Sequence, residues 1–369
     1  MNQRTDMPLP SAAESLELLG LFPAFHTRNA GGIQVSGELA WEALVTACSA
    51  RGRRAHALQV DLSQSVLGDT EPHSTITQTR FNAALQVFRA RWAPASVLCW
   101  HADLIPLIPL IRSSERRILF LHGIEAWQQP GWVKQRLFAG LDLLLANSEY
   151  TLARAREAAP ILRRVRAEIV PLGIGEPVGS SLPEPDAAPA AIMIGRLERS
   201  ERYKGHEAVL DAWPAVLKRR PDARLWMVGD GDLRMELEAR ARQLDLAEHV
   251  VFFGRVDERR KEELLGRARC LLLPSRAEGF GLVYAEAMRV GRPSLVGSED
   301  AGREVVNPPE CGLSASADRA DSLVESIGRL LTPGAEWDAW SRNALRRHAE
   351  RYTAAAFQER LVRTLWRDQ

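Results

Sequence analysis

The chain has 369 residues, which is more than one typical core holds and suits two domains. A hydrophobic fraction of 46% with 26% charged residues is typical of a globular protein and excludes the fibrous and disordered classes. The net charge of +1, from 48 basic and 47 acidic side chains, argues against a nucleic-acid-binding protein, because such proteins carry a strong basic excess.

In the first part of the chain, short apolar runs alternate with longer amphipathic stretches. This alternation predicts strands joined by helices, and hence a mostly parallel sheet with helices on both faces. The predicted strands are Leu16–Leu21, Ala55–Leu62, Ser96–Trp100, Ile118–Leu121, Leu141–Ala146 and Glu168–Leu172, and the predicted helices are Ser36–Ala50, Thr75–Arg91 and Tyr150–Ala159.

The alternation stops between Gly175 and Ala190. This segment is rich in proline, glycine and serine, so it is predicted to be a linker between two domains. A second series follows, with strands at Ala191–Ile194, Arg224–Val228, Val250–Phe253, Cys270–Leu273 and Ser294–Val296, and with helices at His206–Arg219, Leu233–Leu244, Glu258–Arg267, Leu282–Arg289, Glu336–Arg351 and Thr353–Trp366.

The predicted fold class is therefore α/β, with two doubly wound Rossmann-like domains facing a central cleft. Ligands of such sheets bind beyond the carboxyl ends of the strands. The four isolated cysteines lack a CxxC pair and favour a reducing compartment. The apolar stretch Leu16–Phe25 contains Glu17 and Pro23, unlike a signal peptide, and no stretch approaches the roughly 18–20 apolar residues of a membrane span. We expect a cytoplasmic protein.

The most informative segment runs from Pro274 to Glu286. An apolar strand ends at Pro274 and a helix opens near Gly281, where glycines and the helix N-terminus suit a phosphate. The carboxylates of Glu278 and Glu286 suit the hydroxyl groups of a sugar or ribose. Taken alone, the segment is equally compatible with a strand–helix unit that carries a glycine turn and two solvated glutamates.

The segment from Glu278 to Glu286 resembles the E-x7-E motif of retaining glycosyltransferase family 4, including its G-F-G core. The resemblance covers most of residues 190–310 in order and spacing. Further matching elements of this region are Ile194–Leu197, Tyr203–Gly205, Val228–Gly231 and Val251–Val256. A looser resemblance covers the N-terminal half and the last helix, at Asn29–Gln34, Leu121–Glu125, Ala146–Thr151, Leu172–Gly173 and Arg351–Leu361.

The resemblance implies the GT-B arrangement of two Rossmann-like domains. Residues 1–175 would bind the acceptor and residues 176–352 the donor, with the C-terminal helix, about 353–369, crossing back to the first domain. It also implies retaining transfer of a hexose from GDP-mannose or a UDP-hexose, without a metal. The acceptor expected at family level is a lipid-linked oligosaccharide of bacterial surface polysaccharide assembly.

The residues suggest how a diphosphate would be held. Arg196 and Lys204 follow a strand end, where Arg forks onto phosphate oxygens and Lys acts as a point charge. They can neutralise a leaving diphosphate, so no metal is then needed. Solvated charges on a loop are the alternative interpretation.

The resemblance also assigns roles to single residues. Glu286 would bind the ribose, Glu278 would contact the donor sugar, the backbone near Val256 would read the base, and His122 would lie at the reacting centre. A capped core histidine is the alternative for His122. The catalytic candidates are His122, Arg196, Lys204 and Glu278. The donor-binding candidates are Gly32, Gly195, Arg196, Lys204, Val256, Glu278, Gly279, Phe280, Gly281, Leu282 and Glu286. The acceptor candidates are Gly31, Gly32, His122, Glu125 and Trp127.

Two motifs are misleading, and two segments depart from the family pattern. Asp230 and Asp232 spell a D-x-D metal motif, but their position at a strand end predicts a turn and a helix N-cap. The pair of glycines at Gly31 lacks the full dinucleotide fingerprint. The departures are Gly312–Ala317, which replaces the family's V-D-P, and the loop Ser298–Glu304.

Other functions remain open. One is a non-catalytic sugar-nucleotide-binding protein, and another is a sugar-nucleotide epimerase of similar fold. The basic residues Lys134 and Arg136 lie near Trp127 and Trp132 in the sequence, and aromatic residues among cations suit a membrane interface. We therefore expect peripheral docking on the inner membrane face, with a solvated basic face as the alternative. No nucleic-acid partner is expected.

Overall fold

The computed structural model of the chain describes residues 16–25, 31–62, 79–90, 92–112, 114–177 and 184–367. The chain forms two compact units, one of residues 1–170 with 358–369 and one of residues 171–357. Three expected segments lie partly outside the described residues: the loop at Asn29 and Ala30, the helix at 75–78 and the linker at 178–183.

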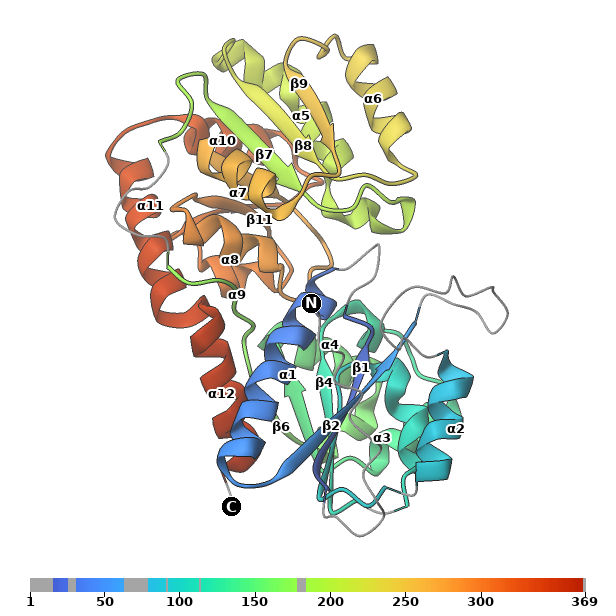
Figure 1. Cartoon of the computed structure of the whole chain (residues 1–369). Helices are drawn as coiled ribbons and strands as arrows, with labels where there is room; N and C mark the ends of the chain where they lie inside the picture. The colour runs from blue at the N-terminus through green and yellow to red at the C-terminus, as the bar shows by residue number, and fades with distance from the viewer. Residues whose placement is uncertain are drawn as a thin grey trace, which may run out of the picture. The chain divides into compact units, whose positions relative to one another are not determined.

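The first unit is built on a parallel six-stranded sheet in the order β2-β1-β3-β4-β5-β6 (Figure 1). Its strands are β1 (Leu16–Pro23), β2 (Arg54–Val60), β3 (Ser96–Cys99), β4 (Arg116–Leu121), β5 (Leu143–Ala146) and β6 (Arg166–Ile169). Its helices are α1 (Gly32–Ala50), α2 (Arg80–Ala90), α3 (Trp132–Ala139) and α4 (Glu149–Ala158), with the shorter 3-10 segments η1 (Ala102–Leu110), η2 (Ile124–Ala126) and η3 (Pro160–Arg164).

The second unit repeats this plan with the order β12-β11-β10-β7-β8-β9. Its strands are β7 (Ala190–Ile194), β8 (Arg224–Val228), β9 (Val250–Gly254), β10 (Cys270–Leu273), β11 (Ser294–Gly297) and β12 (Gly312–Ala315). Its helices are α5 (His206–Arg219), α6 (Arg234–Gln243), α7 (Glu258–Arg267), α8 (Leu282–Arg289), α9 (Gly302–Val306), α10 (Ala320–Leu331) and α11 (Ala335–Arg347), with η4 (Arg199–Lys204) and the π-helical η5 (His348–Tyr352).

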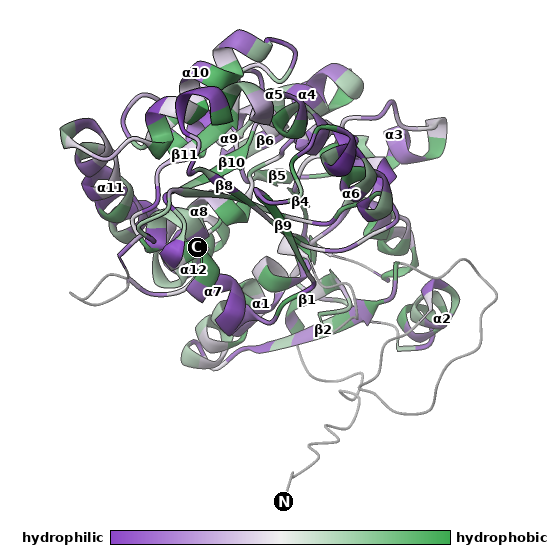
Figure 2. Ribbon diagram, turned by 90° about the horizontal axis from the view of Figure 1, so that it is seen from above, coloured by the Kyte–Doolittle hydropathy of each residue, from purple (hydrophilic) through white to green (hydrophobic). Residues whose placement is uncertain are grey.

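Both sheets are covered on both faces. Every residue of β5 and of β10 is buried, although neighbouring side chains along a strand point to opposite faces. A strand buried on both sides must carry a continuous apolar run, which explains the sequences LLLA and CLLL. In Figure 2 these interior strands are green, while the helices carry purple residues.

The boundary between the units lies earlier than residue 175. The segment from Pro171 pairs with the chain near its C-terminal end, where Ile174 N–H donates to Tyr352 O at 2.8 Å and Ala354 N–H donates to Gly175 O at 2.9 Å. A Cβ at Gly173 would lie 2.1 Å from the carbonyl oxygen of Thr353, so only glycine permits this approach. These contacts group residues 171–175 with the second unit.

The last helix, α12 (Ala354–Trp366), begins in the second unit and ends in the first. Its second part packs beside α1 (Figure 1). Gln358 Nε2 donates to Leu39 O at 3.0 Å, and the guanidinium of Arg51 lies 4.9 Å from the ring centroid of Trp366.

The predicted fold class is confirmed, and several helices and one strand are additional. The segments that are not predicted are η1, η2, α3, η3, η4, α9, α10 and β12. The predicted helix Glu336–Arg351 is in fact α11 followed by the π-helical turn η5. Pro106 and Pro109 interrupt helical periodicity in η1, which explains why its sequence gives no α-helical signal.

Candidate functional site

The strand order of the second unit locates a site. In this sheet β8 lies on one side of β7 and β10 lies on the other. The order in which the chain adds strands therefore reverses between β7 and β10. Ligands of doubly wound sheets bind beyond the carboxyl ends of the strands at such a reversal. Gly195 and Arg196 follow β7, and the segment from Pro274 to Glu278 follows β10. The topology therefore brings these candidates to one edge of the sheet.

A buried carboxylate organises the two candidate cations. Glu201 is only 5% exposed, and its carboxylate contacts the guanidinium of Arg196 and lies 2.7 Å from Lys204 Nζ. The side chain of Arg196 is 53% exposed, so its guanidinium is accessible to a ligand. Two cations against one carboxylate leave net positive charge, as a diphosphate requires.

Gly195 belongs to the same arrangement. A Cβ at this position would lie 3.1 Å from Lys204 Nζ, which is tighter than an ordinary contact. The absence of a side chain at Gly195 therefore leaves room for the Lys204 amine beside the end of β7. Glu201 itself was not among the predicted site residues. The sequence places Glu201 three residues before Lys204, but only the structure shows the 3-10 turn that brings the two side chains together.

Glu278 lies beside this cluster. Burial raises the pKa of its carboxyl group, the charge of Glu201 raises it further, and Lys204 and Arg196 oppose the rise. The carboxyl group of Glu278 is therefore coupled to the three charges of the cluster.

A second carboxyl group, that of Asp300, stands close to Glu278 and was missed by the sequence analysis. Asp300 follows β11 and is 3% exposed, and its Oδ1 accepts a hydrogen bond from Gly302 N–H at 2.9 Å. The next residue, Ala301, donates its N–H to Glu278 O at 3.2 Å, which ties the two loops together. Burial, followed by the charge of Glu278, raises the pKa of Asp300 to about 8. Asp300 lies in the loop that departs from the family pattern.

Glu286 has a different environment. It lies on α8, which opens at Gly281 with a φ of 76° that favours glycine. Glu286 Oε1 lies 3.0 Å from Lys261 Nζ, and the same amine pairs with Glu258 at 2.7 Å. Lys261 is a further residue that sequence reasoning missed. A cavity of about 100 Å³ adjoins the pair and is lined by Ile174, Gly175, Glu258, Lys261, Glu262, Leu265, Glu286 and Arg289.

The remaining donor candidates differ in exposure. Phe280 is 4% exposed and packs edge-to-face with Tyr352 at a centroid distance of 5.8 Å. Its side chain is therefore part of the core. Gly279 is also buried, whereas Leu282 and Val256 are partly exposed.

In the first unit, His122 ends β4 and is 6% exposed. Its Nε2 lies 2.8 Å from Trp100 O, and because a carbonyl only accepts, Nε2 carries the proton. The buried Nδ1 then has no partner among the described residues. Burial, with the nearby His101, lowers the pKa of His122 to about 3, so the ring is neutral at physiological pH. It is a buried histidine with one unsatisfied acceptor.

The acceptor candidates of the first unit lie at the ends of its strands. Glu125 Oε1 accepts hydrogen bonds from His122 N–H at 2.6 Å and Gly123 N–H at 3.0 Å, so this carboxylate fixes the turn after β4. Trp127 packs edge-to-face against Tyr150 at a centroid distance of 5.5 Å and is partly buried, whereas Trp132 is exposed. Gly31 and Gly32 form the start of α1, where Gly31 N–H donates to Gln34 Oε1 at 3.0 Å.

The D-x-D pair corrects one expectation. Asp232 does not cap the helix that follows, because the N-cap of α6 is Leu233. Instead, Asp232 Oδ1 accepts from Arg199 N–H at 2.8 Å, and Asp230 accepts from Gly231 N–H at 3.0 Å. Both carboxylates thus serve backbone turns. Within the described ranges, no group of three or more His, Cys, Asp or Glu side chains could hold a metal ion.

Comparisons with known proteins show what the chain is similar to. Residues 180–347 match the family model described as Glycosyl transferases group 1. A GDP-mannose-dependent monoacylated alpha-(1-6)-phosphatidylinositol monomannoside mannosyltransferase of Corynebacterium glutamicum is 26% identical over 78% of this chain and 80% of its own length. A phosphatidyl-myo-inositol mannosyltransferase of Mycobacterium leprae is 32% identical over 50% of this chain and 46% of its own length.

Solved structures share the fold. Sucrose-phosphate synthase from Thermosynechococcus elongatus superposes with a TM-score of 0.74 at 20% identity, covering 96% of this chain and 100% of that one. HepE of Anabaena, solved in complex with UDP and glucose, gives 0.71 at 16% identity, covering 95% and 99%. The chain has the GT-B fold of two Rossmann-like units. The donor-side motifs lie within residues 180–347, and this segment of the chain matches the group 1 glycosyl transferases.

Proposed function

We propose that this protein transfers a mannosyl group from GDP-mannose to a phosphatidylinositol-type glycolipid, with retention of the anomeric configuration. The observation that carries the transfer is the cluster in which Glu201 holds Arg196 and Lys204 at the carboxyl end of β7. The named activities of the two mannosyltransferases support this donor and acceptor.

The residues of the second unit would bind the donor. Arg196 and Lys204 would neutralise the diphosphate, Glu278 would contact the sugar, and Glu286 would accept hydrogen bonds from the ribose. The segments at Gly279, Gly281, Leu282 and Val256 would supply backbone contacts. Glycines and the N-terminus of α8 suit such contacts, because helix N-terminal N–H groups point outward.

The reaction would proceed on one face of the sugar. The bond between the anomeric carbon and the diphosphate oxygen breaks as the acceptor oxygen bonds to the same face, and the departing phosphate oxygen takes the acceptor proton. Positive charge from Arg196 and Lys204 stabilises the leaving group, as in electrostatic catalysis generally. No metal is needed for that neutralisation. The neutral ring of His122 suits a hydrogen-bonding role near the sugar.

The first unit would bind the acceptor and contact a lipid surface. Among the described residues of this unit, five of the eight exposed large apolar side chains lie on α2, η1 and α3, and both helices pack against η1. They are Phe81, Phe88, Leu110, Trp132 and Val133. Trp132, the most exposed of them at 73%, adjoins Lys134, and a pocket of about 340 Å³ lies between Trp132 and Arg80.

This combination suits an anionic bilayer, because aromatic residues favour the interface and basic residues favour anionic headgroups. Among the described residues, no helix combines the length and apolarity needed to span a bilayer. Peripheral docking of the first unit is therefore the mode that we propose for membrane contact.

A ligand titration tests the donor assignment. Thermal denaturation is measured with GDP, UDP and ADP at one common concentration, and a nucleotide present at 100 times its dissociation constant stabilises the protein by about 2.7 kcal/mol. We expect GDP to give the largest shift, and Arg196→Ala to abolish it. A larger shift with UDP would replace mannose by a UDP-linked hexose, and no shift with any nucleotide would contradict the donor site.

A further inference from the structure

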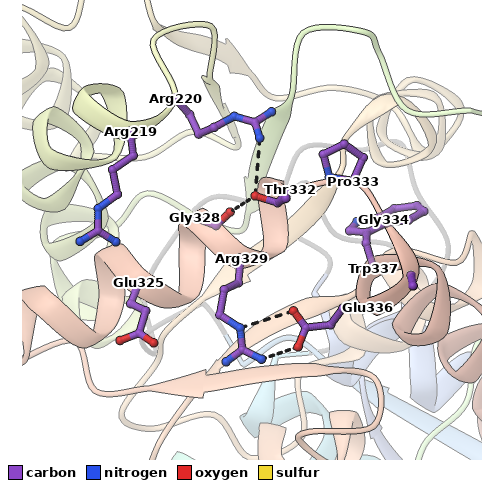
Figure 3. A pocket seen from close by; sticks show the side chains of 11 residues that line it. Arg219, Arg220, Glu325, Gly328, Arg329, Thr332, Pro333, Gly334, Glu336 and Trp337 are labelled. Carbon is purple, nitrogen blue, oxygen red and sulfur yellow. Dashed lines mark hydrogen bonds and ion pairs between the residues drawn. The ribbon is translucent and has the colours of Figure 1, made fainter.

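A second pocket of the second unit is shown in Figure 3. It lies at the edge of the sheet opposite the donor candidates. Arg219 and Arg220 end α5 and precede the start of β8, so they stand at the amino end of a strand. The donor candidates instead follow the carboxyl ends of β7 and β10. The pocket has a volume of about 470 Å³. Its lining comes from the ends of α5 and α10 and from the start of α11.

Three arginines contribute cations to this pocket. Arg220 reaches toward Thr332 Oγ1 at 3.5 Å, and Arg329 is held by both carboxylate oxygens of Glu336, as Figure 3 shows. Arg219 is exposed and takes part in no hydrogen bond or ion pair among the described residues. The guanidinium of Arg219 is thus available for an anion, whereas Arg220 Nε also lies 3.6 Å from Asp222 Oδ1.

More positive charge lies behind the pocket wall. The ring of Trp337 is 8% exposed, and the guanidiniums of Arg269 and Arg292 lie over it at 5.4 and 5.8 Å from the centroid. Burial, together with the charge of Arg269, lowers the pKa of Arg292 to about 10. The pKa of Arg269 is lowered by burial and by Arg220. The guanidiniums of Arg269 and Arg292 thus add two cations behind the pocket wall.

The start of α11 faces the same space. Gly334, its N-cap, has a φ of 136° and no side-chain cap, and a Cβ there would meet no atom within 4 Å. The first N–H groups of a helix have no partner within that helix and favour anions. This 13-residue helix therefore adds backbone donors to the arginines.

Carboxylates complete the lining. Glu325 and Glu336 stand among the arginines. Acidic groups oppose a bare anion, but they accept hydrogen bonds from hydroxyl groups. Arginines and carboxylates together fit a ligand with a phosphate at one end and hydroxyls at the other, and the volume suits a small molecule.

We propose that this pocket is a second binding site of the second unit, for a phosphorylated sugar. Arg219 and Arg220 take the phosphate, with the first turn of α11 beside them, and Glu325 accepts hydrogen bonds from the hydroxyl groups. The site is separate from the donor residues, and its existence does not depend on the proposed transfer.

Calorimetric titration of the full chain with mannose 6-phosphate tests the site, with inorganic phosphate as the comparison probe. We expect Arg219→Gln to weaken binding about tenfold or more, since a charged hydrogen bond is lost. The matched control is Lys218→Gln, an exposed cation of the same helix outside the pocket lining. It should leave the affinity unchanged.

Two further variants keep the test decisive. Glu325→Gln should weaken mannose 6-phosphate more than inorganic phosphate, because its role is toward hydroxyl groups. Arg196→Ala, at the donor cluster, should leave the affinity for mannose 6-phosphate intact. Binding that is lost in Arg196→Ala but kept in Arg219→Gln would assign the ligand to the donor site and overturn the proposal. Equal binding by wild type, Arg219→Gln and Lys218→Gln would overturn it as well.

Discussion

Glu201 Oε2 lies 2.7 Å from Lys204 Nζ, and the same carboxylate also contacts Arg196. A buried carboxylate that holds two cations fixes their positions before a ligand arrives. Fixed positive charge is the form in which electrostatic stabilisation of a leaving group is most effective.

Glu201→Gln should therefore lower turnover more than it lowers stability. The substitution keeps the shape of the side chain but removes the charge that positions Arg196 and Lys204. We expect kcat to fall by roughly 10- to 100-fold, which corresponds to about 1.4–2.7 kcal/mol. Steady-state kinetics and thermal denaturation measure the two effects. Glu198→Gln, in the same segment, is the matched control, and an unchanged kcat in Glu201→Gln would contradict a positioning role.

Glu286→Ala should weaken nucleotide binding by roughly 10- to 150-fold, because a charged hydrogen bond contributes about 1.5–3 kcal/mol. Folding should be disturbed less, since Lys261 keeps its contact with Glu258 at 2.7 Å. Glu258→Ala removes the other partner of the same amine and is the control. If the two variants bind nucleotide equally well, the proposed ribose contact is wrong.

Asp300 should make the protein less stable as the pH rises. Its pKa of about 8 in the folded state lies above the ordinary value of 3.8, so the folded state holds a proton that the unfolded state has released. Stability therefore falls between about pH 4 and pH 8, by at most about 1.4 kcal/mol per unit.

Asp300→Asn removes this dependence. The thermal midpoints of wild type and variant should approach each other near pH 4. Toward pH 8, the midpoint of the variant should rise relative to that of wild type. A constant difference between wild type and Asp300→Asn across this range would show that Asp300 is ionised in the folded protein.

Chelation should leave turnover intact. The charge of the diphosphate is met by Arg196 and Lys204, and Asp230 and Asp232 are engaged with backbone N–H groups at 3.0 and 2.8 Å. Turnover with and without EDTA is the measurement. Loss of activity on chelation, restored by Mn²⁺ or Mg²⁺, would assign a metal to the D-x-D pair instead.

Trp132→Ala should weaken binding to anionic vesicles without lowering nucleotide affinity. The indole is 73% exposed and adjoins Lys134, which suits the interface of a bilayer. Co-sedimentation with vesicles that contain phosphatidylserine, at low and high salt, measures it. Met235→Ala, an equally exposed apolar residue of the second unit, is the control. Equal sedimentation of wild type and Trp132→Ala would contradict docking through α3.

Much of the second unit could be predicted because glycine, proline and charged residues bound its apolar runs. The strand Cys270–Leu273 and the helices His206–Arg219 and Leu282–Arg289 have the predicted bounds. β12 is not predicted, since its sequence GLSA contains one large apolar residue. α10 is also not predicted, although its buried residues recur at helical spacing.

The site was harder to predict than the fold. Motif spacing identified Arg196, Lys204, Glu278 and Glu286. It did not identify the charged residues that lie beside them. Glu201 and Lys261 act through ion pairs, which depend on how turns and helices pack. Asp300 owes its raised pKa to burial and to the charge of Glu278, which lies 22 residues earlier in the sequence. Such relationships arise from tertiary structure and leave little local signal.

The most direct test of the proposed function is the transfer reaction itself. Purified protein is incubated with GDP-mannose and phosphatidylinositol-bearing vesicles, and the lipid product is analysed by mass spectrometry and NMR. We predict a mannosylated lipid with the anomeric configuration of the donor, and its loss in Arg196→Ala. Release of free mannose without a lipid product, or a product of inverted configuration, would contradict the proposal.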